Sequence, residues 1–402
     1  MPDVFELIEK EKQRQITTLG MIPSENLASV DVLRACGSVL ANKYAEGYPF
    51  KRYYQGNEIV DQIEQLAIEL AEKLFGAEHA NVQPNSGSPA NMAVYNALLK
   101  PGDKIMSMDL MHGGHLTHGS KVNFSGKTYD IIHYGVETNG FLDMDKIRAL
   151  AEETKPKLIL SGYTAYPRTI DFKEFHDIAQ SVGAYSFADI SHIAGLCATG
   201  VHVSPTPDTD VVMTTTHKTL RGPRGAIILC KSQYASAIDK AVFPGLQGGP
   251  HENTIAAKAV AFQEAMKPEF KDYCEQIVKN AKTLANVLIE NGLTLVSGGT
   301  DNHLMLIDLR PLGIDGKTGA VALEKAGIVV NANTIPYETG TPMKPSGIRL
   351  GTPLLTTRGM KEGEMKDIGI WVVDVLKDTG NAGKQENIRK DVLALCAKFP
   401  FY

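Results

Sequence analysis

Short apolar segments alternate with longer helix-like segments between residue 76 and about residue 250, and this alternation restricts the possible folds more than any other feature of the chain. Strands that alternate with helices in this way indicate a mostly parallel sheet covered by helices on both faces. The chain is therefore expected to be an α/β protein. The expected strands are Asn81–Gln83, Lys104–Met108, Leu158–Gly162, Ala184–Ala188, Asp210–Thr214 and Ala226–Cys230.

Helical periodicity and further strands surround this region. A chain of 402 residues exceeds what one hydrophobic core usually supports. We therefore predict an N-terminal arm with helices (1–75), a large domain (76–267) and a small α+β C-terminal domain (268–402). Helices are expected at 4–18, 29–41, 58–75 (ending at Gly76), 90–100, 254–291, 361–377 and 386–397, and further strands near 293–297, 303–309 and 346–350.

The composition is that of an ordinary globular protein. Hydrophobic residues make up 43% and charged residues 22%, and the net charge of −5 is spread along the chain, which does not suggest a nucleic-acid partner. The five cysteines are scattered without CxxC spacing, so we expect neither disulfides nor a zinc site but reduced thiols in a cytoplasm. The N-terminal residues lack the apolar core of a signal peptide, and no apolar stretch is long enough to span a membrane.

A lysine and an aspartate follow two of the expected strands. Lys218 lies in the polar loop Thr214–Gly225, and Asp189 ends the strand Ala184–Ala188. A lysine amine can condense with the aldehyde of pyridoxal phosphate, and a carboxylate can keep its ring nitrogen protonated, so that the ring accepts electrons. Separately, Lys218 could be a solvated loop residue and Asp189 a helix cap. Their pairing favours a Schiff-base site.

Two more segments suit a phosphorylated aromatic cofactor. Asn85–Pro89 precedes a helix and offers backbone N–H groups for phosphate, with Ser86 and Gly87 as the expected contacts, although plain capping is the alternative. His112–Gly119 contains three histidines at every third position. Because glycines interrupt a regular helix there and no acidic or cysteine ligand adjoins, we predict no metal site. His115 could instead lie over a pyridine ring or pack its own loop.

A tyrosine-rich segment and one distant arginine complete the candidate residues. Tyr44–Pro49 and Arg52–Tyr54 enclose one carboxylate, Glu46, which could have a raised pKa and move a proton, or could be an exposed acid in an interface loop. Arg349, in the C-terminal part, could clamp a substrate carboxylate through two hydrogen bonds or form a structural ion pair.

Taken together, these segments resemble serine hydroxymethyltransferase, a fold-type I enzyme that depends on pyridoxal phosphate, over roughly residues 5–378. Such an enzyme has a mostly parallel, seven-stranded-type sheet flanked by helices. The combination and order of the matching motifs are highly specific. The matching motifs are Ser24–Asn26, Lys43–Pro49, His112–Gly119, Asp189–His192, Thr214–Gly225, Gly245–Pro250 and Ser346–Arg349.

The resemblance implies a role for each matched residue. Lys218 would form the Schiff base, Asp189 would contact the pyridine nitrogen, and His115 would stack on the ring. The other implied cofactor contacts are Thr164 and His192 near the ring hydroxyl, Ser86, Gly87 and, from a neighbouring subunit, Gly249 at the phosphate, and His217, with Thr215 as a further catalytic residue.

The substrate residues are implied in the same way. Arg349 would bind the amino-acid carboxylate, and Glu46 would act as acid and base on the serine hydroxyl and folate. The other implied substrate contacts are Ser24, Tyr44, Tyr53, His192 and, near the folate pterin, Asn333. In the family Tyr44, Glu46 and Tyr53 come from the partner chain, which implies a homodimer or tetramer with shared active sites.

A few positions depart from the family's usual pattern. Thr164 stands where serine is common, Gln55 replaces a usual glycine, and Met213 replaces the first of four threonines. His251–Asn253 replaces an apolar-histidine stretch. None of these changes removes a catalytic group. The tail beyond about residue 378 is not covered by the resemblance.

The expected reaction is reversible transfer of the hydroxymethyl group of L-serine to tetrahydrofolate, which gives glycine and 5,10-methylenetetrahydrofolate, a step of one-carbon metabolism and amino-acid biosynthesis. One alternative is a folate-independent aldolase or transaldolase of β-hydroxy amino acids such as threonine or α-methylserine. A pyridoxal-binding regulatory protein without turnover is another. An aminotransferase would share the lysine–aspartate pair but has no evident use for the Tyr44–Glu46 loop.

Overall fold

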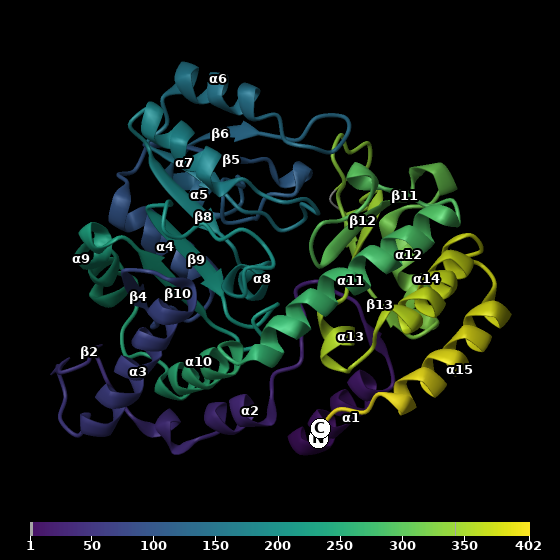
Figure 1. The fold of residues 1–402 in the computed structure, drawn as a ribbon, viewed down its shortest axis with the longest axis horizontal. Helices are drawn as coiled ribbons and strands as arrows, with labels where there is room; N and C mark the ends of the chain where they lie inside the picture. Colours follow the sequence, from purple (N-terminus) through teal and green to yellow (C-terminus); the bar gives the residue numbers. More distant parts are fainter. Residues whose placement is uncertain (1–2, 342) are drawn as a thin grey trace.

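The computed structural model describes residues 3–341 and 343–402, which form two α/β regions connected by long helices (Figure 1). The larger region contains a seven-stranded sheet with the order β4-β10-β9-β8-β7-β5-β6. Its strands are β4 (His79–Asn81), β5 (Lys104–Met108), β6 (Asp130–Tyr134), β7 (Leu158–Ser161), β8 (Tyr185–Asp189), β9 (Val211–Thr215) and β10 (Ala226–Cys230). The predicted mostly parallel α/β fold is confirmed.

Most strands of this sheet run parallel, and both of its faces are buried. The pairs β6–β5, β5–β7, β7–β8 and β8–β9 are parallel, whereas β10 is antiparallel to both β9 and β4. Along β10, Ile227 and Leu229 join one hydrophobic core, and Ile228 and Cys230 join the other. Burial on two faces explains why these strands read as continuous apolar runs.

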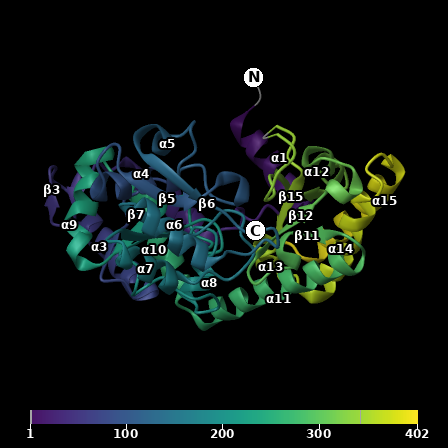
Figure 2. The same ribbon diagram turned by 90° about the horizontal axis from the view of Figure 1, so that it is seen from above.

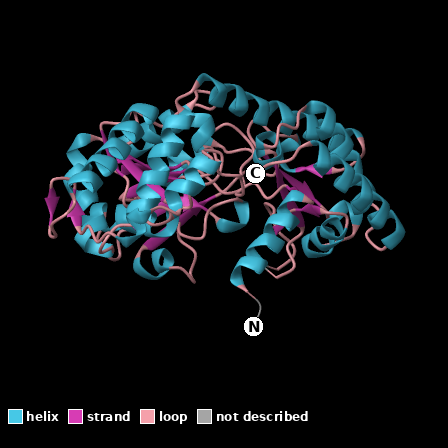
Figure 3. Ribbon diagram, turned by 90° about the horizontal axis from the view of Figure 1, so that it is seen from below, coloured by secondary structure: helices cyan, strands magenta, loops and turns pink. Residues whose placement is uncertain are grey.

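Helices cover both faces of the sheet (Figure 3). Residues of α3, α6, α7, α8 and α10 pack in the first core, and residues of α4 and α9 pack in the second. The helices of this region are α3 (Glu58–Phe75), α4 (Gly87–Leu98), α5 (Phe124–Thr128), α6 (Met144–Thr154), α7 (Phe172–Ser181), α8 (Ala194–Ala198), α9 (Ser232–Lys240) and α10 (Glu252–Ala265). Helix α3 matches its prediction and ends at Gly76, whose φ of 65° is left-handed.

Two strand predictions need correction. The edge strand β6 was not predicted, because Asp130 and His133 are exposed and interrupt its apolar run. The first strand begins and ends two residues before the predicted Asn81–Gln83. The regular ladder of β4 ends at Asn81, since the carbonyl of Val82 accepts a hydrogen bond from a lysine side chain; further on, the carbonyl of Pro84 accepts from that lysine and from the N–H of Ala226 in β10.

The helix predictions fail where glycine or proline interrupts the backbone. The single helix expected over 254–291 is two, α10 and α11 (Pro268–Glu290), because Pro268 has no N–H to donate and the preceding Lys267 is extended. The helix expected over 29–41 divides at Gly37 into α2 (Val30–Cys36) and a 3₁₀ turn, Val39–Asn42.

The smaller region packs helices against a four-stranded antiparallel sheet with the order β11-β12-β15-β14. Helix α12 and strand β14 were not predicted. Its elements are α11, β11 (Thr294–Leu295), β12 (Leu304–Asp308), α12 (Gly316–Lys325), β13 (Ile328–Val329), β14 (Asn331–Asn333), β15 (Gly347–Gly351), α13 (Pro353–Thr357), α14 (Glu362–Leu376) and α15 (Ala382–Lys398).

The N-terminal segment returns to this smaller region. Helix α1 (Val4–Ile16) lies beside it (Figure 2), and β1 (Leu19–Gly20) pairs in parallel with β13. Arg358 donates to the carbonyls of Ile16 and Thr18 at 3.1 and 2.9 Å, and the hydroxyl of Tyr402 donates to the carbonyl of Ala28 at 2.5 Å. The predicted domain boundaries at residues 75 and 267 remain predictions.

Candidate active site

Lys218 lies in a closed loop between the ends of β9 and β10. Thr216 N–H donates to the carbonyl of Gly225 at 3.0 Å, and Gly222 N–H donates back to the carbonyl of Thr216 at 2.7 Å. Arg221, at φ 60°, adopts the left-handed conformation that reverses the chain. These constraints hold Lys218 against the sheet, where it is only 8% exposed.

The amine of Lys218 is suited to nucleophilic attack. Burial, the largest cause, lowers its pKa to about 8, although Asp189 opposes the shift. Near neutral pH an appreciable fraction of the amine is therefore unprotonated and has a free lone pair.

Asp189 ends β8 as an ionised carboxylate. Ser191 donates to Oδ1 through its hydroxyl at 2.5 Å, Asn91 donates to Oδ2 at 3.2 Å, and His118 Nε2 lies 2.9 Å from Oδ2. Burial alone raises the pKa of Asp189, but the hydrogen bond and charge of His118 outweigh it and hold the pKa well below its ordinary value. A negative charge is thus fixed at the end of this strand.

His118 and Asn26 are site residues that the sequence analysis missed. His118 belongs to the predicted histidine segment, but its imidazole bridges Asp189 and Tyr95, whose hydroxyl lies 2.6 Å from Nδ1. Asn26 donates to the backbone carbonyl of Lys218 at 2.8 Å. The histidine spacing and the Ser24–Asn26 motif were visible signals, but neither contact could be assigned without the fold.

The N-terminus of α4 forms an open corner of the site that is suited to an anion. Ser86 is its N-cap, yet its side chain makes no capping hydrogen bond, and the first helical residue is Gly87. A Cβ at Gly87 would lie 2.9 Å from Cγ2 of Thr215, so a larger residue would close this corner. Free backbone N–H groups at a helix N-terminus attract phosphate.

Arg349 reaches the same cavity from β15. It is 6% exposed, and its guanidinium donates to the carbonyl of Thr164 at 2.6 Å and to Oδ1 of Asn331 at 3.2 Å. No carboxylate pairs with it among the ion pairs of the described chain, and burial lowers its pKa to about 10. A buried, unneutralised guanidinium favours an anionic ligand.

These groups surround a cavity of about 440 Å³ at the strand ends of the large sheet. Burial lowers the pKa of His115 to about 4 and that of His192 well below its ordinary value, so both are neutral near pH 7. His192 also stacks on His303 of the smaller region, with ring centroids 5.5 Å apart. The predicted residues that line the cavity are Ser24, Ser86, Gly87, His115, Thr164, Asp189, His192, Thr215, His217, Lys218 and Arg349.

The other predicted residues lie outside this cavity. Tyr44 and Tyr53 are 57% and 70% exposed, and the hydroxyl of Tyr44 donates to Oε1 of Glu46 at 3.3 Å. Gly249 lies against the same loop, since a Cβ there would be 3.3 Å from the Tyr44 ring. Asn333, on β14, does not line the cavity either. Within one chain, this second group is separate from Lys218.

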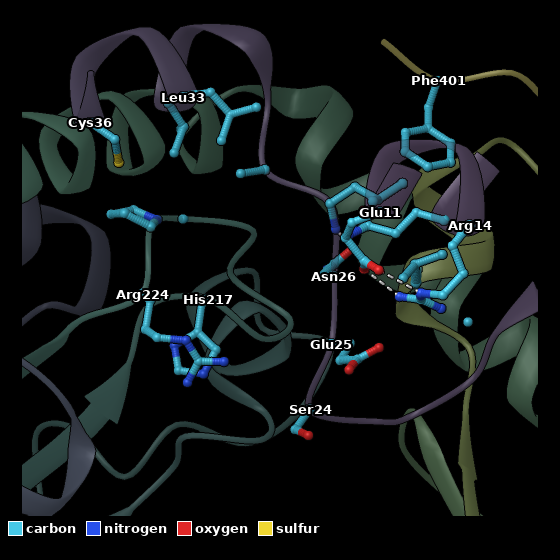
Figure 4. Close-up of a pocket in the computed structure, with 18 of the residues that line it drawn as sticks. Glu11, Arg14, Ser24, Glu25, Asn26, Leu33, Cys36, His217, Arg224 and Phe401 are labelled. Atoms are coloured by element: carbon cyan, nitrogen blue, oxygen red, sulfur yellow. Dashed lines mark hydrogen bonds and ion pairs between the residues drawn. The ribbon is translucent and has the colours of Figure 1, made fainter. Parts of the chain in front are cut away.

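A second cavity of about 340 Å³ adjoins the first and is shown in Figure 4. It lies between the N-terminal arm and the lysine loop, and Ser24, Glu25, His217 and Arg224 line both cavities. In Figure 4, His217 and Arg224 lie side by side across from Ser24 and Glu25. Nδ1 of His217 is buried without a hydrogen-bond partner.

Two absences concern residues 3–341 and 343–402. No group of three or more histidine, cysteine, aspartate or glutamate side chains is arranged to hold a metal ion. No helix in the described part of the chain is long and apolar enough to cross a membrane.

The cavity at the strand ends of the mostly parallel sheet combines a buried lysine amine, an ionised aspartate and a helix N-terminus. This combination is typical of the class of pyridoxal-phosphate-dependent α/β enzymes. A family profile described as serine hydroxymethyltransferase matches residues 1–372. A serine hydroxymethyltransferase of Desulfotalea psychrophila is 55% identical over 399 residues, which are 99% of this chain and 94% of that protein. The chain belongs to the serine hydroxymethyltransferase family.

Members of this family depend on pyridoxal 5'-phosphate and use tetrahydrofolate as a co-substrate. The residues of the cavity fit this cofactor. Lys218 offers a free amine, Asp189 a fixed negative charge, and Gly87 an open corner at a helix N-terminus.

Proposed function

We propose that this protein converts L-serine and tetrahydrofolate reversibly into glycine and 5,10-methylenetetrahydrofolate. The family supports this reaction, and the observation that carries it in this chain is the unneutralised Arg349 in the cavity that contains Lys218 and Asp189. A cavity with one fixed cation beside an amine nucleophile suits an α-amino acid.

In this proposal the residues of the large sheet hold the cofactor. Lys218 would bind its aldehyde carbon, Asp189 would hold the pyridine nitrogen protonated, and the neutral His115 would stack on the ring. When bound, pyridoxal phosphate supplies an electron-accepting ring next to the substrate Cα. The remaining proposed contacts are Ser86 and Gly87 with the phosphate, Thr164 and His192 with the ring hydroxyl, and Thr215 and His217 beside the lysine.

Arg349 would orient the amino acid, and Glu46 would move its proton. Two N–H groups of Arg349 already donate to Thr164 and Asn331. Its remaining N–H groups can therefore bind the substrate carboxylate, and Ser24 lines the same cavity. The carboxylate of Glu46 would take the proton from the serine hydroxyl oxygen and return a proton when the reaction reverses. Tyr44 and Tyr53 would position this carboxylate, and Asn333 would contact the pterin.

We also propose that the enzyme is a homodimer with shared sites. Glu46 and Gly249 lie together outside the cavity of their own chain, which supports their use by a second copy. Dimers with a two-fold axis make each such contact twice. Because the five cysteines are unpaired, we propose a reducing compartment, the cytoplasm.

Serine cleavage tests the proposed reaction. Purified protein loaded with pyridoxal phosphate should form glycine from L-serine at a rate that depends on tetrahydrofolate, and the Lys218→Ala variant should not. The cofactor absorbance with glycine should change further when tetrahydrofolate is added. A rate of glycine formation that does not depend on tetrahydrofolate would contradict the proposal and indicate an aldolase.

A further inference from the structure

Five charged side chains form a cluster behind the candidate active site, away from the cavity. Arg52 is 3% exposed, Glu64 and Glu252 are fully buried, and Lys258 is 1% exposed. Asp61, at 10%, closes the cluster on its outer side. Buried charges on this scale are costly unless they are paired and hydrogen-bonded. We call Arg52, Asp61, Glu64, Glu252 and Lys258 the buried charge cluster.

Arg52 connects the cluster to the loop of residues 44–54. Its guanidinium donates to Asp61 at 2.8 Å and to Glu64 at 2.6 Å. Its Nη1 also donates to the carbonyls of Ala45 and Gly47, at 2.9 and 3.0 Å. These carbonyls flank Glu46. Arg52 therefore fixes the backbone on both sides of the proposed acid-base residue.

Gln83 strengthens this attachment. Its side-chain amide donates to the carbonyl of Gly47 at 2.9 Å and to Glu64 at 2.7 Å. The loop also closes on itself, since Tyr53 N–H donates to the carbonyl of Glu46 at 2.9 Å. The loop backbone is thus anchored to α3 and to the segment after β4, while Tyr44, Tyr53 and Tyr54 are exposed.

Lys258 connects the other side of the cluster to the cofactor loops. Its ammonium donates to the carbonyls of Val82, Pro84 and Ala226, at 2.6, 3.0 and 2.9 Å. Val82 and Pro84 lead into the corner at Ser86, and Ala226 follows the loop that carries Lys218. Three acceptors use all three protons of an ammonium, so the geometry specifies the charged form even though burial lowers the pKa of Lys258 to about 7.

Glu252 balances the charge of the cluster. The cluster contains three carboxylates but only two cations. Neither carboxylate oxygen of Glu252 accepts a hydrogen bond. Its nearest cationic atom is Nη1 of Arg52, 3.7 Å away. Burial, followed by the neighbouring Glu64 carboxylate, raises the pKa of Glu252 to about 8. A proton kept on Glu252 leaves the cluster neutral.

We propose that Arg52 and Lys258 are positioning residues, and that the buried charge cluster joining them holds loop 44–54 at a fixed place relative to the cofactor corner of the same chain. The inference rests on the proposed function, which assigns Glu46 and the cofactor to these two parts. In the proposed dimer loop 44–54 serves the partner's site, so the cluster connects the acid-base residue of one site with the cofactor corner of the other.

Two variants separate the two connections. Lys258→Met should weaken pyridoxal phosphate binding by about tenfold, measured by cofactor titration, because three carbonyls lose their donor. Arg52→Lys should leave that affinity within about twofold and lower kcat about 100-fold, because a lysine cannot hold both carbonyls around Glu46. Lys240→Met, at an exposed lysine, is the control for loss of charge.

Hydrogen–deuterium exchange distinguishes positioning from general stability. Lys258→Met should speed exchange in segments 82–88 and 216–226, and Arg52→Lys should speed it in 44–54, while the smaller region stays unchanged. Faster exchange over the whole chain, or wild-type cofactor affinity in Lys258→Met, would overturn the proposal. These readouts need no turnover, so they stand even if the serine reaction proves wrong.

A second variant applies if Lys258→Met does not fold. A Cβ at Gly225 would lie 2.6 Å from Cε of Lys258, so Gly225→Ala pushes the ammonium aside without removing its charge. It should speed exchange in segment 82–88 and weaken cofactor binding. Wild-type exchange in that segment would count against a positioning role of Lys258.

Discussion

The cofactor cavity and loop 44–54 are built in opposite ways. Lys218, Asp189 and Arg349 are 8%, 7% and 6% exposed, and each is held by several hydrogen bonds or by a closed loop. Tyr44 and Tyr53, in contrast, are 57% and 70% exposed, although the backbone beneath them is anchored by Arg52. The residues lining the cavity are thus buried within one chain, whereas Tyr44 and Tyr53 of the loop stay largely exposed on it.

A backbone can therefore be firmly anchored while the side chains that it carries remain exposed. An exposed group of aromatic side chains on a well-anchored backbone is suited to insertion into another surface, because little ordering entropy is lost on binding. If the two regions belong to one reaction, substitutions in either of them should impair it.

Removing the lysine should have the largest effect. We expect Lys218→Ala to lower kcat at least about 1,000-fold, because no other amine in the cavity can bind the cofactor aldehyde. Steady-state serine cleavage with saturating pyridoxal phosphate measures this. Lys240→Ala, at an exposed lysine outside the cavity, is the matched control. Activity retained in Lys218→Ala would break the assignment of the cavity.

Changing the carboxylate of Glu46 should lower kcat less than removing Lys218, and it allows the proposed sharing of sites between two chains to be tested. We expect Glu46→Gln to lower kcat by about 100-fold with unchanged cofactor affinity. Mixing Glu46→Gln and Lys218→Ala chains after reversible dissociation should restore activity, because one site of each mixed dimer would contain Lys218 and Glu46 from different chains. Mixtures no more active than their components would show that the loop serves its own chain.

Replacing Arg349 by lysine should weaken the binding of the substrate but not that of the cofactor. We expect Arg349→Lys to raise the KM for serine by about 10- to 100-fold, because an ammonium cannot bind a carboxylate through two parallel hydrogen bonds. The cofactor titration should stay at the wild-type value. A KM within twofold of wild type would indicate that another group holds the carboxylate.

The smallest effect concerns stability and pH. The pKa of the Glu252 carboxyl lies near 4.5 in the unfolded chain and at about 8 in the folded chain. There the carboxyl faces Asp61 and Glu64 of α3, Arg52 of loop 44–54 and Lys258 of its own helix. Between these values the folded chain binds the extra proton, so wild-type stability falls as the pH rises.

The Glu252→Gln variant cannot lose that proton. Its stability relative to wild type should increase by about 1–3 kcal/mol between pH 5 and pH 8, as measured by urea unfolding. Gln62→Asn, at an exposed and uncharged position on the neighbouring α3, should show a difference that does not change with pH. A constant difference for Glu252→Gln as well would mean that Glu252 is already ionised in the folded chain.

The sequence was most informative where a local pattern of residue types is typical of one structural or chemical role. The large sheet and α3 with its stop at Gly76 followed from apolar runs and glycine, and the lysine–aspartate pair indicated a cofactor site; most other residues that line the cavity were expected only from the family resemblance. The edge strand β6 did not, because exposure on one side breaks the apolar pattern.

Contacts between distant segments were beyond reach for a different reason. The bond from Asn26 to Lys218 and the bonds from Lys258 to Val82 and Ala226 join residues far apart in the chain. No local pattern records which carbonyl a buried amide or ammonium will meet. Glu252 stood out only as a departure from the family pattern.

The return of the N-terminal arm also sets an order of assembly during synthesis. The arm leaves the ribosome first, but β1 pairs with β13, and Thr18 meets Arg358, more than 300 residues later. Asn26, which holds the loop of Lys218, lies between these attachments and the bond from Tyr402 to Ala28. The arm therefore lacks these attachments until Arg358 has been made, so a product truncated before it would carry Lys218 without the docked arm that holds its loop.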